Sequence, residues 1–246
     1  MSLRDDINNI TKQLLNGVMQ QLTVTDEDAY VKDDVSKVTR TRVTAELCST
    51  LVKLHNLKIS DHQSMIKKLT KWLIDNQNAD GSWNETHINY DKPSTVFTSI
   101  CALSLLETAE SFPDLNIDEE IFDRAAKFIL KQEIYYGEYK KSELVHADIL
   151  NVDAMVAAFL LKFGSRSSNE SYIQAGKMAV AHICSYQFID GAYPYGGPYR
   201  AYPYKYHFYI PCIHYQAVTL YYLIKTTPYI KSEWLEHSIS SGTKWL

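Results

Sequence analysis

Apolar and polar positions define two kinds of helical segment along this chain. In the first kind, apolar residues recur three and four positions apart, which indicates a helix with one buried face. This pattern occupies residues 65–73, 121–129 and 173–183. In the second kind, apolar residues cover nearly every face, so the helix must be enclosed on most sides. This pattern occupies residues 95–108, 149–163 and 210–225.

A recurring turn motif joins the two kinds of segment. It consists of a Gln, a short spacer, a Gly, one further residue and an aromatic, and the Gln recurs at intervals of 55 residues. The three copies contain Gln77, Gly81 and Trp83; Gln132, Gly137 and Tyr139; and Gln187, Gly191 and Tyr193. Repeated helix pairs of this kind bury the apolar helices inside a ring of amphipathic ones. The sequence therefore predicts an all-α fold, an α/α toroid, with a curved solenoid as the weaker option.

Net charge and hydropathy restrict the partners. The formal net charge is −4 and no long basic run is present, which argues against nucleic acid and anionic membranes as partners. No apolar run approaches the roughly 20 residues that span a bilayer. Residues 1–15 lack the apolar core of a signal peptide. We expect a cytoplasmic protein that binds a small molecule.

Residues 71–83, KWLIDNQNADGSW, closely resemble the QW motif of triterpene cyclases. That motif belongs to the prenyltransferase and squalene oxidase repeat superfamily, and the resemblance covers roughly residues 60–246. The later copies keep Gln and Gly but have Tyr in place of Trp. The resemblance implies a terpene cyclase-like or prenyltransferase-like protein, with isomerase, lyase or transferase activity, that holds a polyprenyl or terpenoid ligand in a central aromatic cavity.

The turn residues themselves are predicted to be structural rather than catalytic. Asp-Gly suits a tight turn in which Gly tolerates positive φ. A Gln amide has donors and an acceptor that can tie a helix end to the next helix. This prediction covers Gln77, Gly81, Trp83, Gln132, Gly137, Gln187 and Gly191.

The repeats suggest one domain over residues 1–246, with the weakest support over residues 1–58. The chain holds about four and a half helix pairs, fewer than the toroids of this superfamily usually have. We therefore expect that the first residues help to close the ring, that a partner domain or subunit completes an open barrel, or that the sequence is part of a longer protein.

The candidate catalytic residues lie at the start of the apolar helix 149–163. Class II cyclases protonate their substrate with an acid in a DxDD motif, and the matching positions here read NVDA, residues 151–154. Asp153 takes the place of the central acid, whereas Asn151 and Ala154 replace its flanking acids. His146 and Asp148 lie about one turn earlier and are the groups that can assist it. The resemblance thus assigns proton donation to Asp153.

The candidate ligand-binding residues come mainly from a Tyr-rich segment, residues 191–209. Its interleaved Gly and Pro exclude a regular helix, and long loops in compact domains are often functional. Tyrosines can line a cation-stabilising cavity or stack on sugar rings, and a cation among them can hold a diphosphate or carboxylate. The predicted ligand-binding set is Tyr193, Tyr195, Tyr199, Arg200, Tyr202, Tyr204 and, in the next helix, His214.

No cofactor or metal is expected from the sequence. Prenyltransferase β-subunits bind zinc through Asp, Cys and His, but Ala192 stands where the Cys is required after Asp190. Cys212 and His214 are two residues apart on a helix and point in different directions. No DDxxD-type run for magnesium lies in a helical context, and the sequence leaves a role for magnesium open.

Two other classes of function compete with the terpenoid interpretation. The first is a carbohydrate-active α/α-barrel enzyme, a glycosidase, lyase or epimerase, with Asp148, Asp153, Glu138 and a tyrosine base as candidates. The second is a binding toroid without catalysis. Paired carboxylates about 5–10 Å apart in the cavity favour the carbohydrate enzyme, whereas a wholly apolar cavity excludes it.

Overall fold

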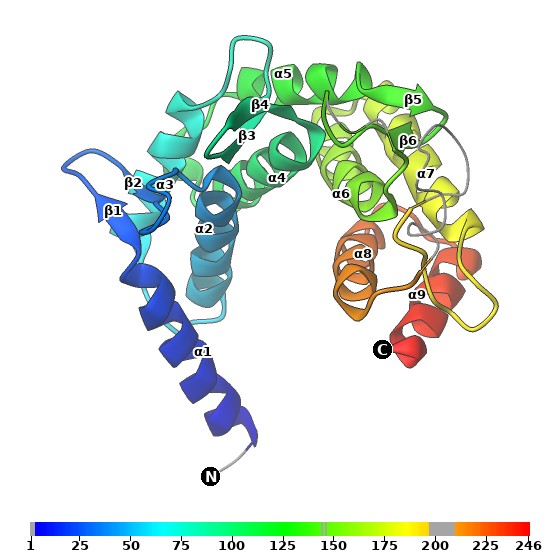
Figure 1. Cartoon of the computed structure of the whole chain (residues 1–246), viewed down its shortest axis with the longest axis horizontal. Coiled ribbons are helices and arrows are strands. Elements are labelled where there is room, and N and C mark those ends of the chain that lie inside the picture. Colours follow the sequence, from blue (N-terminus) through cyan, green and yellow to red (C-terminus); the bar gives the residue numbers. More distant parts are fainter. Residues whose placement is uncertain (1–2, 144, 146, 197–209) are drawn as a thin grey trace.

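The computed structural model describes residues 3–143, 145, 147–196 and 210–246. These residues form an open arch of two helical layers (Figure 1). The inner layer follows the concave side and contains α2 (Thr41–Asn56), α4 (Thr95–Ser111), α6 (Leu150–Ser167) and α8 (Ile213–Thr226). The outer layer contains α3 (Gln63–Asp75), α5 (Glu119–Leu130), α7 (Glu170–Ser185) and α9 (Glu233–Trp245). Helix α1 (Leu3–Met19) extends from one end, and a short 3-10 helix, η1 (Pro113–Leu115), links α4 to α5.

Burial explains the two layers. The central inner helices, α4 and α6, have buried residues on every face, because they pack against neighbouring inner helices and against the outer layer. The outer helix α5 buries one side only, through Ile121, Phe122, Ala125 and Ile129. The predicted all-α toroid, with apolar helices inside and amphipathic helices outside, is confirmed. Among the described residues, no helix is both long and apolar enough to cross a membrane.

Three short antiparallel hairpins were not anticipated from the sequence. They are β1 (Leu22–Val24) with β2 (Ala29–Val31), β3 (Trp83–His87) with β4 (Tyr90–Ser94), and β5 (Glu133–Tyr135) with β6 (Glu138–Tyr139). The segments after the first two turn motifs are therefore strands rather than irregular loops. In β3, Trp83 and Glu85 point inward while Asn84 and Thr86 are more exposed, as the pleat requires. The hairpins precede inner helices, so they mark the rim of the arch at which those helices begin.

Each turn glycine packs against the backbone of the next outer helix. Gly81, Gly137 and Gly191 have φ values of 91°, 80° and 94°. A Cβ on Gly81 would lie 2.3 Å from the carbonyl oxygen of Arg124 in α5. The corresponding distance is 2.5 Å to Met178 in α7 for Gly137, and 2.3 Å to Ser241 in α9 for Gly191. Positive φ and this close approach each require glycine.

The glutamines of the turns make two different sets of bonds. Gln77 Nε2 donates to the carbonyl oxygens of Gly81 and of Ile121 in α5, at 3.0 and 2.9 Å. Gln187 repeats this arrangement with Gly191 and Ser238, at 2.9 and 2.8 Å. Gln132 instead donates back to Phe128 of its own helix, at 3.1 Å. Its turn has one more residue before the glycine, and this changes where the amide lies.

The aromatic residue of each turn is held by the following inner helix. The backbone N–H of Trp83 donates to Thr98 Oγ1 at 3.0 Å, and the indole Nε1 donates to the Leu73 carbonyl at 2.8 Å. Asp153 Oδ1 accepts the N–H of Tyr139 at 2.8 Å, and Gln216 Oε1 accepts that of Tyr193 at 2.7 Å. Thr98, Asp153 and Gln216 therefore occupy equivalent positions in consecutive repeats.

Because Trp83 Nε1 donates to the Leu73 carbonyl, we expect a moderate loss of stability when Trp83 is replaced by another aromatic residue. Trp83→Phe removes the bond to Leu73 and leaves a small void at a fully buried site. We expect it to lower the free energy of unfolding by about 2 kcal/mol, measured by urea denaturation. Trp234→Phe is the matched control, because Trp234 is 48% exposed, and it should change that free energy by less than about 0.5 kcal/mol. Equal effects would contradict the assigned role of Trp83.

Candidate functional site

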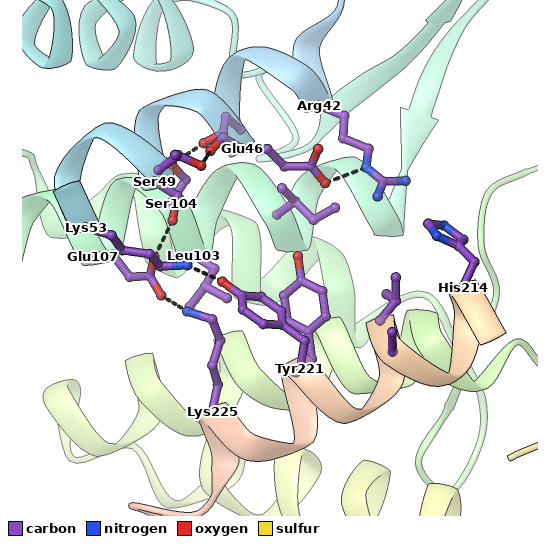
Figure 2. Close-up of a pocket in the computed structure, with 16 residues that line it drawn as sticks. Arg42, Glu46, Ser49, Lys53, Leu103, Ser104, Glu107, His214, Tyr221 and Lys225 are labelled. Carbon is purple, nitrogen blue, oxygen red and sulfur yellow. Dashed lines mark hydrogen bonds and ion pairs between the residues drawn. The ribbon is translucent and has the colours of Figure 1, made fainter. Parts of the chain in front are cut away.

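A groove of about 350 Å³ lies on the concave face, between α2, α4 and α8. Figure 2 shows side chains from all three helices pointing into it. Its polar lining is Arg42, Glu46, Ser49, Thr50 and Lys53 from α2, Ser104 and Glu107 from α4, and His214, Tyr221, Tyr222 and Lys225 from α8. Apolar residues such as Ile100, Leu103 and Val218 fill the remainder. We call this the concave groove, and it can receive a ligand that forms many hydrogen bonds.

Glu107 is the central anion of the concave groove. Its Oε1 pairs with Lys225 Nζ, and its Oε2 accepts a hydrogen bond from the Ser49 hydroxyl (Figure 2). Burial acts to raise the pKa of Glu107, but the Lys225 ammonium and the Ser49 hydroxyl outweigh it, so that pKa lies below its usual value. Glu107 is therefore an ionised carboxylate at neutral pH and accepts hydrogen bonds in the concave groove.

A second carboxylate, Glu46, lines the same groove as Glu107. Glu46 Oε1 accepts a hydrogen bond from Arg42 Nε at 2.8 Å, and both side chains are partly open to solvent. Ser49, which bonds Glu107, is three residues from Glu46 on α2, or about 4.5 Å along the helix axis. Both carboxylates line the concave groove, with Glu46 turned toward Arg42 and Glu107 toward Ser49 and Lys225 (Figure 2).

Two lysines surround a tyrosine on the third helix of the concave groove. Lys53 Nζ donates to Tyr221 Oη, which bridges α2 and α8. The Nζ atoms of Lys53 and Lys225 also lie 4.8 and 5.2 Å from the centre of the Tyr221 ring. The phenol oxygen thus faces the groove beside an ammonium group.

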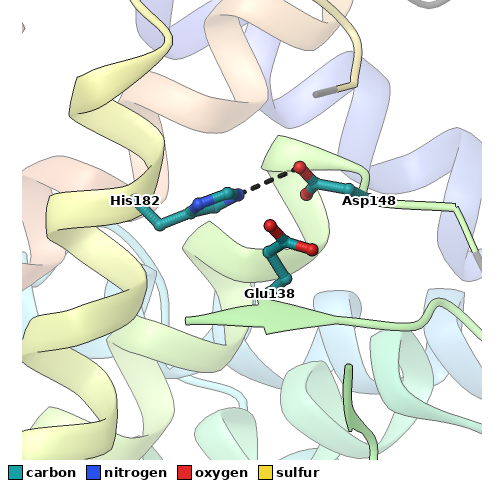
Figure 3. A group of neighbouring side chains, drawn as sticks. All are labelled: Glu138, Asp148 and His182. Atoms are coloured by element: carbon teal, nitrogen blue, oxygen red, sulfur yellow. Dashed lines mark hydrogen bonds and ion pairs between the residues drawn. The ribbon is translucent and has the colours of Figure 1, made fainter. Parts of the chain in front are cut away.

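A second, buried cluster lies at the rim where α6 begins. Glu138 comes from β6, Asp148 from the segment before α6, and His182 from the outer helix α7, and their side chains converge (Figure 3). One ligand-type atom from each lies within 4.8 Å of those of the others. His182 Nε2 is 3.0 Å from Asp148 Oδ2 and 3.9 Å from Asp153 Oδ2. We call these four residues the rim cluster.

The carboxylates of the rim cluster are buried and lie close enough to interact. Asp153 is fully buried, and Glu138 and Asp148 are each 5% exposed. Burial, and then the neighbouring carboxylate of Asp148, raise the pKa of Asp153 well above its usual range. Asp153 lies between the two helical layers and is not among the residues that line the concave groove.

The structure brings some of the predicted site residues together and separates others. Asp148 and Asp153 are neighbours in the rim cluster, and Glu138 joins them. Tyr193 is buried and its hydroxyl bonds Ser238 at 2.6 Å, while the Tyr195 ring packs against Tyr215 at a tilt of 39°, with centroids 4.3 Å apart. Five predicted residues lie outside the described part of the chain: His146, Tyr199, Arg200, Tyr202 and Tyr204.

His214 lies in the concave groove, in the first turn of α8, together with Glu46, Arg42 and Glu107, which were not predicted from the sequence. Glu46 and Arg42 belong to α2, in the part of the chain with the weakest repeat signal. Glu107 is one of two charged residues, with Glu110, near the end of a helix that is otherwise uncharged, and this pattern is visible in the sequence. A charge on an inner helix of a toroid must face the concave side or a partner.

Sequence comparisons identify no family, whereas structural comparisons identify the fold. No protein-family profile matches the chain, and no curated protein matches its sequence. An α-mannanase of family GH76 from Bacteroides thetaiotaomicron is similar, with a TM-score of 0.69, 11% identity, and coverage of 98% of this chain and 68% of that one. A reducing-end xylose-releasing exo-oligoxylanase is also similar, with a TM-score of 0.63, 11% identity, and coverage of 96% of this chain and 71% of that one. A polysaccharide lyase has a TM-score of 0.65 and 11% identity, and the match covers 98% of this chain and 71% of that one.

These findings correct the resemblance to the prenyltransferase and squalene oxidase repeat superfamily. The similar structures are carbohydrate-active toroids, so the terpene cyclase and prenyltransferase interpretation, with its isoprenoid ligand, is wrong. The physical reason is that the Gln, Gly and Trp of the turn hold one helix pair against the next. The motif therefore reports the architecture and carries no information about the reaction.

Proposed function

We propose that this chain is a carbohydrate-active α/α-toroid protein that binds a saccharide in the concave groove and hydrolyses a glycosidic bond there. The observation that carries the proposal is the pair of carboxylates, Glu46 and Glu107, that line one groove. Glycoside hydrolysis requires two carboxyl groups on either side of the scissile bond, about 5–10 Å apart. Glu107, held ionised, acts as the base or nucleophile, and Glu46 protonates the leaving oxygen.

The lining of the concave groove fits a hydroxyl-rich ligand. Carboxylates, hydroxyls, ammonium groups and an imidazole offer donors and acceptors in every direction, and Tyr221 adds an aromatic face. An isoprenoid chain in the same place would displace the water bound to several charged groups. It offers no hydrogen bonds in return, and burying charges in this way is strongly unfavourable. The similarity to a mannanase, an exo-oligoxylanase and a lyase supports the same class of ligand.

One specific contact favours a second candidate, β-elimination of a uronate-containing polysaccharide. This reaction requires a base to remove the proton beside the carboxylate and cations to neutralise the carboxylate itself. Tyr221, next to Lys53 and Lys225, offers that combination. Tyr221→Phe separates the two reactions, because it removes the base of the elimination and leaves both groove carboxylates in place.

The test is a panel of manno-, xylo- and uronate oligosaccharides incubated with the purified chain. New reducing ends without ultraviolet absorbance indicate hydrolysis, and the absorbance of an unsaturated uronate indicates elimination. Calorimetric titration of the same panel detects binding. Binding without turnover would indicate a toroid that binds saccharides and does not cleave them. We expect turnover of at least one member. Neither binding nor turnover of any member at millimolar concentration would overturn the proposal.

A further inference from the structure

We propose that the rim cluster is a divalent-metal site, with Glu138, Asp148, Asp153 and His182 as ligands and Zn²⁺ as the best-matched ion. This site is separate from the concave groove and does not rest on the saccharide proposal. It is also distinct from Asp190, Cys212 and His214, at which the sequence predicts no zinc site.

The first argument is that buried oxygens in the rim cluster lack hydrogen-bond donors. Among the described residues, Asp148 Oδ1 and Asp153 Oδ2 have no hydrogen-bond partner. Asp153 is fully buried, the side chain of Asp148 is 3% exposed, and Asp153 Oδ2 lies 3.9 Å from His182 Nε2. Buried carboxylate oxygens without a partner are strongly unfavourable, and buried charges are normally paired or bound to a metal.

The second argument comes from comparing the three repeats. In each repeat, a side chain of the inner helix accepts the backbone N–H of the turn aromatic. Asp153 does so in the middle repeat, whereas the neutral side chains of Thr98 and Gln216 do so in the neighbouring repeats. The residue before the turn aromatic is Ser82 in the first repeat and Ala192 in the third, whereas it is Glu138 in the middle repeat. Holding the turn therefore does not require acids. Only the middle repeat places carboxylates at both positions, and a bound cation explains them.

The third argument is the identity and geometry of the ligands. Tetrahedral zinc binds nitrogen and carboxylate oxygen at 2.0–2.2 Å, so its ligand atoms are about 3.4 Å from one another. The observed separations from His182 Nε2, 3.0 Å to Asp148 and 3.9 Å to Asp153, bracket that value. An imidazole ligand favours zinc over calcium or magnesium. The Tyr139 N–H fixes Asp153 through Oδ1 and leaves Oδ2 to face the ion.

The metal would join three parts of the fold. Glu138 belongs to a rim hairpin, Asp148 and Asp153 to the start of an inner helix, and His182 to the outer helix α7. We therefore expect zinc to stabilise the chain as well as to bind it. At a zinc concentration 100-fold above the dissociation constant, Tm should rise by roughly 5–10 °C.

The experiment begins with the full chain stripped by EDTA and titrated with ZnCl₂. Elemental analysis after equilibrium dialysis should give one zinc per chain, and His182→Gln should lose it together with the rise in Tm. His87→Gln is the matched control, because His87 also pairs with a carboxylate, Glu85 at 3.2 Å, but is largely exposed. That variant should bind zinc as the unaltered chain does.

A measurement on the unaltered chain keeps the proposal testable if His182→Gln does not fold. X-ray absorption at the zinc edge should show a nitrogen and oxygen shell near 2.0 Å containing one imidazole. Absence of stoichiometric zinc would overturn the proposal and leave the rim cluster as carboxylates that share a proton. A sulfur shell near 2.3 Å, or undiminished zinc in folded His182→Gln, would also overturn it.

Discussion

Gly81→Ala is expected to lower the free energy of unfolding by roughly 3–5 kcal/mol. The new Cβ would lie 2.3 Å from the carbonyl oxygen of Arg124, and φ at this position is 91°. The strain of the left-handed backbone adds to the overlap, and neither is relieved by a rotamer change because the neighbouring atom belongs to the backbone of α5. Urea denaturation followed by circular dichroism measures the effect.

Gly17→Ala is the matched control for this prediction. It makes the same chemical change at an exposed position in α1, with no atom within 4 Å of the added Cβ. Alanine is the better helix former, so the control should stabilise the chain by up to about 1 kcal/mol. A loss below about 1 kcal/mol for Gly81→Ala would show that α5 moves away freely, and it would contradict the role assigned to the turns.

The architecture was predictable because it depends on patterns of residues that are close together in the sequence. Apolar spacing located the inner helices, and the recurrence of Gln and Gly located the turns. The altered bonding of Gln132 was also visible in principle, since its turn has one residue more than the others before Gly137. The rim hairpins were missed because strands of two to five residues carry too few alternating positions to be distinguished from loops.

The site was much less predictable because its contacts are distant in sequence. Glu107 and Lys225 are separated by 118 residues, and they meet only because α4 and α8 face the same groove. Asp148 and Asp153 were selected, but their partner His182 lies on an outer helix that the sequence assigned to structure. The terpenoid interpretation failed for a related reason. The turn motif that resembles that superfamily holds one helix pair against the next in this chain, so it indicates the fold and not the chemistry.

Glu107→Gln has the largest expected effect on activity. On the oligosaccharide that the panel identifies, we expect kcat to fall by about 10²–10⁴-fold, because the neutral amide can act neither as base nor as nucleophile. Glu46→Gln should produce a loss of similar size if Glu46 is the acid. Tyr221→Phe should leave hydrolysis nearly unchanged. Retention of more than a tenth of kcat by Glu107→Gln would exclude this carboxylate from the reaction.

A second variant separates this catalytic effect from a loss of stability. Glu107→Gln leaves Lys225 partly buried without its counterion, which should lower the free energy of unfolding by about 2 kcal/mol. In Glu107→Gln/Lys225→Met the unpaired charge is gone, so stability should recover while kcat stays low.

The pH dependence of the stability of the chain gives an independent readout. Because the folded-state pKa of Glu107 is lowered, its contribution is complete above the ordinary glutamate pKa of about 4.3 and is lost as the pH falls through the lower folded value. The unaltered chain should therefore lose this part of its stability in acid, and the double variant should not.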